Sequence, residues 1–233
     1  MGNIITNISL PGTLCSYDLD LPYLNFIILN PSYIIPIRHY HWNDELPTIL
    51  MCHANAEDIG HIDVEKLAHQ YQVNIVTFDY ANYGLHSCRE ASEEHCYKDV
   101  FAVYYYLKSK NIDNIILYSR SIGTGVACHL AYHLCLAKIP HKLILVSPFK
   151  SVMTTMINIW TPFDLFLNYL IAPAITCPTL VINGCHDNVT DCKRSCELAD
   201  LFPNCEFVSI KGTGHHDVYK VEQFDKVLMD FIH

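Results

Sequence analysis

The most informative segment of the chain reads Ser119-Arg120-Ser121-Ile122-Gly123. Residues 114–118 before it form an apolar run that is typical of a buried strand, and residues 124–137 after it carry a helical pattern. A serine at a sharp turn from strand to helix exposes its hydroxyl beside the N–H groups that begin the helix, and such a hydroxyl can act as a nucleophile. The segment therefore predicts alternating strands and helices, with a reactive Ser121 at one of the junctions.

Two further segments provide partners for such a serine. Residues 179–183 read as a strand, and Asp187 follows that strand after a short turn. Residues 205–210 read as the last strand, and His215 follows it after a glycine-rich turn. The chemistry needs a histidine that takes the serine proton and a carboxylate that orients the histidine. The chain order serine, acid, histidine is that of α/β hydrolases, in which each member follows the end of a strand.

Each partner has a rival close by in the sequence. Asp191 lies four residues beyond Asp187, but it precedes a helical pattern and has the position of a helix N-cap. His216 adjoins His215, which is the first histidine after the glycine turn. The sequence favours Asp187 and His215 and leaves both rivals open.

The pattern of apolar segments predicts the fold class. An antiparallel pair of strands is expected first, and then strands that are continuously apolar and alternate with helices. Such a succession predicts an α/β-hydrolase fold: a doubly wound, mostly parallel sheet of about eight strands with helices on both faces. The expected strands are 25–29, 33–41, 48–53, 74–80, 114–118, 142–147, 179–183 and 205–210. The expected helices are 62–71, 92–109, 124–137, 191–201 and 218–232. Residues 1–233 are expected to form a single domain.

Residues 149–177 follow the sixth strand, where α/β hydrolases insert a lid, and this segment is short. It is rich in large apolar residues: Met153, Met156, Ile157, Trp160, Phe163, Leu165, Phe166, Leu167 and Leu170. One interpretation is helices packed on the core. The other is a partly exposed apolar groove for an acyl chain. Either way, we expect a minimal lid.

Composition excludes several classes of protein. Of 233 residues 51% are hydrophobic and 17% charged, which is typical of a globular chain with a large core. The net charge is −9 with only 15 Lys and Arg, so nucleic acid is not an expected partner. No apolar stretch approaches the roughly 18 residues of a membrane-spanning helix.

The chain has eleven cysteines and no basic, apolar N-terminal segment of the secretory type. Reduced thiols in the cytoplasm are therefore expected. Cys192 and Cys196, near Cys185 and His186, resemble a metal cluster, but no C-x-x-C pair supports one. We expect neither a metal nor a cofactor.

The N-terminus, Met1-Gly2-Asn3-Ile4-Ile5-Thr6, fits the loose pattern for N-myristoylation at Gly2. An ordinary N-terminus can carry the same residues. A single acyl chain gives only marginal membrane binding, so the pattern predicts at most peripheral membrane contact.

An oxyanion in this site needs two N–H donors. The backbone N–H of Ile122, directly after the nucleophile, is the expected first donor. The second is expected from the loop after the third strand, residues 53–60, where the N–H of Asn55 is the candidate. His53 is expected to brace this loop rather than to take part in the chemistry.

Four segments resemble the α/β-hydrolase domain-containing 17 proteins, and the similarity runs from about Pro22 to Ile232. The segments are His53–Gly60, Phe78–Gly84, Ile115–Thr124 and Gly212–Asp217. That family consists of small serine hydrolases that remove palmitate from membrane-associated proteins. The resemblance implies the nucleophile Ser121, the acid Asp187, the base His215 and the oxyanion donors Asn55 and Ile122.

The chain departs from the family pattern at four positions near these groups. Ala54, Asn82 and Ser119 stand where the family has glycine, and Arg120 replaces a glutamine. If the glycines hold a positive φ, alanine costs about 1 kcal/mol and asparagine less. If they only permit a close approach of backbone, alanine and serine cost little. None of these changes removes a reacting group. A separate departure is that the family's N-terminal cysteine cluster, which is palmitoylated for membrane anchoring, is absent.

Two functions are consistent with these residues. The first is a serine hydrolase of acyl esters or thioesters, including an acyl-protein thioesterase, that acts on an acylated small molecule, lipid or protein. A lipid esterase, a small-ester hydrolase or a peptidase would use the same residues. The second is a catalytically weak or inactive relative that serves as a binding or scaffold protein. The sequence does not decide the oligomeric state.

Overall fold

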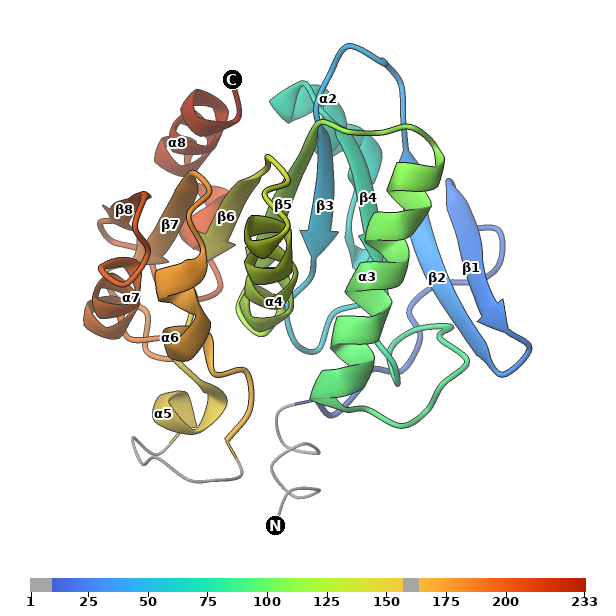
Figure 1. Cartoon of the computed structure of the whole chain (residues 1–233), viewed down its shortest axis with the longest axis horizontal. Helices are drawn as coiled ribbons and strands as arrows, with labels where there is room; N and C mark the ends of the chain where they lie inside the picture. Colours follow the sequence, from blue (N-terminus) through green and yellow to red (C-terminus); the bar gives the residue numbers. More distant parts are fainter. Residues whose placement is uncertain (1–9, 157–163) are drawn as a thin grey trace. The chain divides into compact units, whose positions relative to one another are not determined.

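The computed structural model describes residues 10–156 and 164–233, which form two compact units. One unit ends at Ile115 and the other begins at Ile116. Each contributes four strands, and helices alternate with the strands from the third strand onward (Figure 1). The expected eight strands, mostly parallel and accompanied by helices, are confirmed in the described residues. A single domain over residues 1–233 stays a prediction.

The first unit begins with a hairpin. Its strands are β1 (Leu24–Asn30), β2 (Tyr33–Tyr40), β3 (Thr48–Cys52) and β4 (Asn74–Phe78), in the order β1-β2-β4-β3. β2 pairs with β1 and with β4 in antiparallel fashion, whereas β3 and β4 are parallel. Every residue of β3 and β4 is buried, as continuously apolar strands should be.

Side-chain caps define the helices of this unit. Asp63 accepts a hydrogen bond from the Lys66 N–H at the start of α2 (Val64–Tyr71). Ser92 accepts one from the His95 N–H at the start of α3 (Glu93–Ser109), whose first turn is acidic. Both arrangements satisfy N–H groups that a helix start leaves without partners. In Figure 1, α3 crosses in front of the strands of its unit.

The second unit carries the candidate site at one sheet edge. Its strands are β5 (Ile115–Arg120), β6 (Lys142–Val146), β7 (Thr179–Gly184) and β8 (Cys205–Ile210), in that order and all parallel. The pairing aligns Arg120 with Val146 and Gly184 with Ile210. The loops that follow β5, β7 and β8 therefore leave the sheet at the same edge.

Helices connect these parallel strands and follow the last of them. They are α4 (Gly123–Leu136), α5 (Val152–Met156), α6 (Asn168–Ile171), η2 (Ala172–Ala174), α7 (Cys192–Ala199), η3 (Val218–Lys220) and α8 (Glu222–Ile232). The prediction of one helix over 218–232 is wrong, because Val221 has extended backbone, with φ −119° and ψ 146°. The chain thus forms a short 3-10 helix, a break at this β-branched residue and then α8.

Only short helices occur in the described part of residues 149–177. Met153 and Phe166 are buried, Leu165 and Leu167 are half-buried, and Leu170 is 60% exposed. Gly125 on α4 lies directly against the Phe166 ring, where a Cβ atom would clash. This part of the segment thus packs on the core. Ile157, Trp160, Phe163 and the side chain of Met156 lie outside the described residues.

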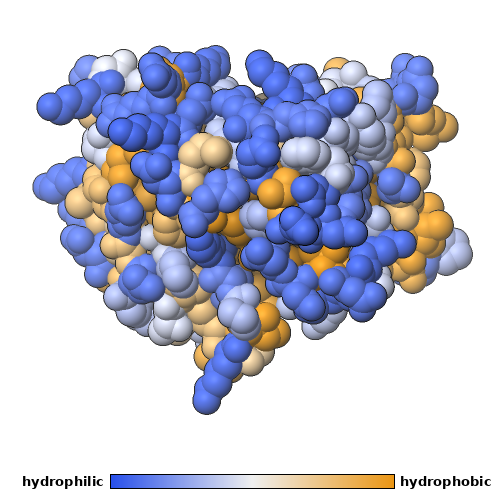
Figure 2. Space-filling view, turned by 90° about the horizontal axis from the view of Figure 1, so that it is seen from above, coloured by the Kyte–Doolittle hydropathy of each residue, from blue (hydrophilic) through white to orange (hydrophobic). Residues whose placement is uncertain are grey.

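Hydrophilic residues cover most of the face shown in Figure 2, and hydrophobic residues form separate patches on it. Among the described residues, no helix combines the length and the apolar character that crossing a membrane requires.

Candidate active site

Ser121 lies at a sharp elbow between β5 and α4. Its φ is 52°, in the left-handed region that L-residues other than glycine rarely adopt. Two backbone hydrogen bonds hold this conformation: Ser121 N–H donates to Val146 O (3.0 Å), and Thr124 N–H donates to Ser121 O (2.9 Å). The side chain is half-buried, so the hydroxyl is supported by the sheet and still accessible.

The structure brings Ser121, His215 and Asp187 together in one hydrogen-bonded chain. His215 Nε2 lies 3.1 Å from Ser121 Oγ, and His215 Nδ1 lies 2.8 Å from Asp187 Oδ2. A proton on Nδ1 is donated to the carboxylate, which leaves the Nε2 lone pair facing the serine hydroxyl. This arrangement can take a proton from Ser121 as its oxygen attacks a carbonyl carbon.

The loop after β7 holds Asp187 as a carboxylate. Its Oδ1 accepts from the N–H groups of Val189 (2.9 Å) and Thr190 (2.7 Å), and its Oδ2 accepts from Thr190 Oγ1 (2.8 Å). Burial alone would raise the pKa of Asp187. The hydrogen bond and charge of His215, with the N–H donors, outweigh burial and lower that pKa to about 2.

Thr190 is a functional residue that the sequence reasoning missed. Besides its two hydrogen bonds to Asp187, its hydroxyl lies 3.3 Å from His215 Nδ1. Behind it, buried Asn183 donates to Thr190 O (3.1 Å), which fixes the loop to the end of β7. The signal available in the sequence was a threonine three residues after an acid, the spacing of a local side-chain turn.

The alternative acid Asp191 and the alternative base His216 do not take part in this hydrogen-bonded chain. Asp191 accepts from the Arg194 N–H (3.1 Å) and caps α7, as its place in the sequence indicated. His216 is exposed, whereas His215 is 6% exposed. Asp187 and His215 are the pair in contact.

A close backbone contact sets the spacing between the acid loop and the histidine loop. A Cβ atom on Gly184 would lie 2.6 Å from Thr213 O, so only glycine permits this approach. Next to it, His186 N–H donates to Thr213 O (2.8 Å). The two loops are thereby held together just ahead of Asp187 and His215.

Two departures from the family pattern fit the elbow. Ser119 is fully buried and donates to Ile144 O (3.2 Å), so its hydroxyl is satisfied. The Arg120 guanidinium lies over the Tyr219 ring, 4.6 Å from the centroid, a favourable cation–π geometry.

The other two departures lie in the first unit. Asn82 has φ 72°, and asparagine is among the residues that tolerate this region best. Ala54 does not have a positive φ, but Ala56, two residues further along the loop, has φ 58°. The strain on this loop, on the order of 1 kcal/mol, therefore falls at position 56 and not at 54.

Ile122 is the N-cap residue of α4 and has helical backbone. Among the described residues, its N–H takes part in no backbone hydrogen bond. Asn55 belongs to the other unit, in the loop after β3, where its Oδ1 accepts from Tyr83 (2.7 Å) and from the Ala56 N–H (2.9 Å). Its role as second oxyanion donor stays a prediction.

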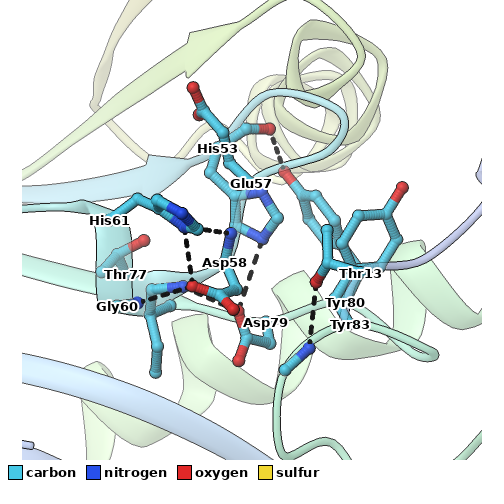
Figure 3. A network of polar contacts seen from close by, with 12 residues as sticks. Thr13, His53, Glu57, Asp58, Gly60, His61, Thr77, Asp79, Tyr80 and Tyr83 are labelled. Atoms are coloured by element: carbon cyan, nitrogen blue, oxygen red, sulfur yellow. Dashed lines mark hydrogen bonds and ion pairs between the residues drawn. The ribbon is translucent and has the colours of Figure 1, made fainter. Parts of the chain in front are cut away.

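A buried polar network supports the loop of residues 53–60 (Figure 3). Asp79 accepts hydrogen bonds from the Tyr17 hydroxyl and the Ile59 N–H (2.9 Å), and its Oδ1 lies 3.7 Å from His53 Nε2. Burial raises the pKa of Asp79 to about 7. The Tyr80 hydroxyl donates to His53 O (2.9 Å). His53 thus has the supporting position expected for it.

A hollow of about 210 Å³ lies beside the acid loop within the second unit. Two segments of the chain line it, one with Phe149, Lys150 and Thr154, and one with Asn188, Thr190 and Arg194. Polar and apolar atoms contribute about equally to its surface, unlike the apolar groove that was one interpretation of residues 149–177.

A family model described as serine hydrolase (FSH1) matches residues 86–221, which include Ser121, Asp187 and His215. The worm protein aho-3 (Caenorhabditis elegans), an α/β-hydrolase domain-containing protein, is 33% identical over 79% of this chain and 57% of its own length. Human α/β-hydrolase domain-containing protein 17C is 31% identical, with the same two shares. The chain thus spans less than two thirds of these relatives.

Solved structures show the same fold. An esterase of Pyrococcus furiosus superimposes with a TM-score of 0.75 at 15% identity and covers 96% of this chain and 98% of its own. Mouse α/β-hydrolase domain-containing protein 10 gives a TM-score of 0.71 at 18% identity, with 90% and 96% covered. The α/β-hydrolase fold is thereby confirmed.

The low pKa of Asp187 predicts a loss of stability in acid. The folded-state pKa of Asp187, about 2, lies below the usual value of about 3.9. Ionised Asp187 therefore adds to the free energy of unfolding above about pH 4, and this contribution is lost as the pH falls through 2. The contribution is about 2 kcal/mol. Urea unfolding at pH 5 and pH 2.5 should show a smaller acid loss for Asp187→Asn than for wild type. Equal losses would contradict the assignment.

The network behind residues 53–60 predicts a second stability effect. Tyr17→Phe removes a donor to buried Asp79 and an acceptor (3.2 Å) for the Leu85 N–H. We expect the free energy of unfolding to fall by about 1–3 kcal/mol. Tyr105→Phe, at a site 64% exposed, is the matched control and should change it by less than about 0.5 kcal/mol. Urea denaturation of both variants checks this, and similar losses in the two would argue against the network.

Proposed function

Because the chain belongs to the serine hydrolase (FSH1) family, we propose that it hydrolyses acyl esters or thioesters through Ser121, His215 and Asp187. The observation that carries this proposal is the hydrogen-bonded chain from Asp187 through His215 to Ser121, with the serine in a left-handed elbow. The φ of 52° costs about 1–2 kcal/mol, and backbone strain of this kind is common at active sites.

The proposed reaction has two halves. Ser121 Oγ attacks the acyl carbonyl carbon while His215 Nε2 takes the hydroxyl proton, and that proton then leaves with the alcohol or thiol. A water molecule, deprotonated by the same nitrogen, attacks the acyl-enzyme, and the acid is released with Ser121 restored. Asp187 keeps His215 in the tautomer that accepts at Nε2 and stabilises the imidazolium formed in each half.

The tetrahedral intermediate carries a negative charge on the former carbonyl oxygen. We assign the N–H of Ile122 as one donor to this oxygen, because it follows the nucleophile and begins α4, where N–H groups point out of the helix. We assign the second donor, on the sequence alone, to the N–H of Asn55.

An acylated protein is the substrate class that we propose within this reaction type, and the chain would then act as an acyl-protein thioesterase. The similarity to α/β-hydrolase domain-containing protein 17C supports it. Three leucines that are half-buried or exposed offer a surface for an acyl chain: Leu165, Leu167 and Leu170. Gly2 lies outside the described residues. Its N-myristoylation, which would bring a cytoplasmic enzyme to membrane-bound substrates, also stays a proposal, and the mass of the native N-terminal peptide tests it.

The catalytic assignment predicts a pattern of labelling by a fluorophosphonate, which reacts with activated serines. Wild type should label, and Ser121→Ala and His215→Ala should not. Ser121→Ala should also lower kcat on an acyl thioester by about 10⁴–10⁶-fold. Matched controls are Ser119→Ala and His216→Ala, which should label like wild type because neither side chain belongs to the hydrogen-bonded chain. A folded wild type that neither labels nor turns over would favour the binding or scaffold protein instead.

The substrate proposal predicts a chain-length preference. If an acyl chain packs on apolar side chains, each buried methylene contributes about 0.8 kcal/mol, so kcat/KM should rise steeply from short to long acyl thioesters. Leu170→Ser, at an exposed position, should reduce this preference and leave the rate on a short substrate unchanged. A flat or inverted preference in wild type would contradict the proposal and leave the triad assignment intact.

A further inference from the structure

Three metal-binding side chains meet in the second unit at a place that the proposed hydrolysis does not use. Cys135 lies in the last turn of α4, His141 directly precedes β6, and Cys177 precedes β7 by two residues. Their ligand atoms all lie within 4.8 Å of one another. Cys135 Sγ and His141 Nε2 are 3.9 Å apart.

The imidazole of His141 is oriented as a metal ligand would be. Its Nδ1 lies 2.8 Å from Ile139 O, so the proton resides on Nδ1 and the Nε2 lone pair faces the sulfur atoms. A backbone carbonyl that fixes the tautomer in this way is the usual outer partner of a zinc-bound histidine. His141 and Cys177 are buried, and Cys135 is half-buried, so solvent reaches one side of the cluster.

We propose that Cys135, His141 and Cys177 bind Zn²⁺. Two thiolates and an imidazole are a ligand set that zinc favours, and a water molecule on the side of Cys135 would complete a tetrahedron. In such a tetrahedron the ligand atoms are about 3.6 Å apart. The observed atoms need to close by about 1 Å at most, which is within the reach of a cysteine side-chain rotation. On binding, each thiol releases its proton to solvent.

This zinc would act on the stability of the fold and not on the proposed hydrolysis. It would tie the end of α4 and the start of β6, whose ligands Cys135 and His141 are six residues apart, to the start of β7, which is distant in sequence. Ser121 lies at the other end of α4, about 21 Å away for a helix of 14 residues. Zinc should therefore raise the stability of the folded chain and leave hydrolysis unaffected.

The experiment uses the full chain, reduced and stripped with a chelator, and adds Zn²⁺ alone. We expect one Zn²⁺ per chain by competition with a chromophoric chelator. The Tm should rise by about 5–10 °C when free zinc exceeds its Kd about 100-fold. Co²⁺ in place of zinc should give the thiolate charge-transfer and ligand-field bands of a tetrahedral sulfur site.

Variants decide where the metal binds. Cys135→Ser and Cys177→Ser should each abolish the Tm rise and the charge-transfer band, with far-ultraviolet circular dichroism as the check of folding. Because Cys177 is buried and its variant can fail to fold, half-buried Cys135 is the decisive position. The double variant Cys192→Ser/Cys196→Ser is the matched control and should keep both signals. Absence of binding in wild type, or loss of binding in the control alone, would overturn the proposal.

Discussion

The backbone contact between Gly184 and Thr213 determines whether the candidate site can form at all. Taken alone, the acid loop and the histidine loop could each adopt many conformations. The strands that they follow do not by themselves fix the position of either loop. With no Cβ at Gly184, the two backbones approach until Thr213 O meets the His186 N–H at 2.8 Å. The acid loop is also fixed from inside, through Thr190 and buried Asn183. His215 therefore meets Asp187 with little freedom left to lose, and the proposed base is preorganised before any substrate binds.

The elbow at Ser121 is stabilised in a different way, because hydrogen bonds from the surrounding strand and helix maintain its strained backbone. Ser121 has an unfavourable φ, and the end of β6 and the first turn of α4 hold it there through hydrogen bonds to Val146 and from Thr124. This explains why a serine is acceptable at position 119. That residue is inside β5 with extended backbone, so glycine's freedom is not needed, and the added hydroxyl finds Ile144 O. The departure from G-x-S-x-G thus does not disturb the nucleophile.

Much of this could be predicted from the sequence, and the exceptions share a physical cause. Continuously apolar strands reveal themselves locally, and Ser121, Asp187 and His215 stand out because each follows such a strand. Thr190 and Asn183 act through contacts that exist only after the loop has folded, and a single threonine or asparagine has no periodicity. The break at Val221 is equally invisible, since the apolar pattern of residues 218–232 continues across it. A positive φ occurs at Ala56 and not at Ala54, because it depends on the course of the turn rather than on which residue replaced a glycine.

Helix α4 contributes to both sites of the second unit, the candidate active site at Ser121 and the proposed zinc site at Cys135. Its N-terminus presents the Ile122 N–H beside Ser121, and its last turn presents Cys135. Its position is further set by the absence of a side chain at Gly125, where the Phe166 ring packs. A metal bound by Cys135, His141 and Cys177 would hold the last turn of α4 against β6 and β7, about 21 Å from Ser121. The first turn of α4 has its own contact with the elbow, because the Thr124 N–H donates to Ser121 O. Stability of the unit and alignment of the elbow would thus depend on the same helix through separate contacts.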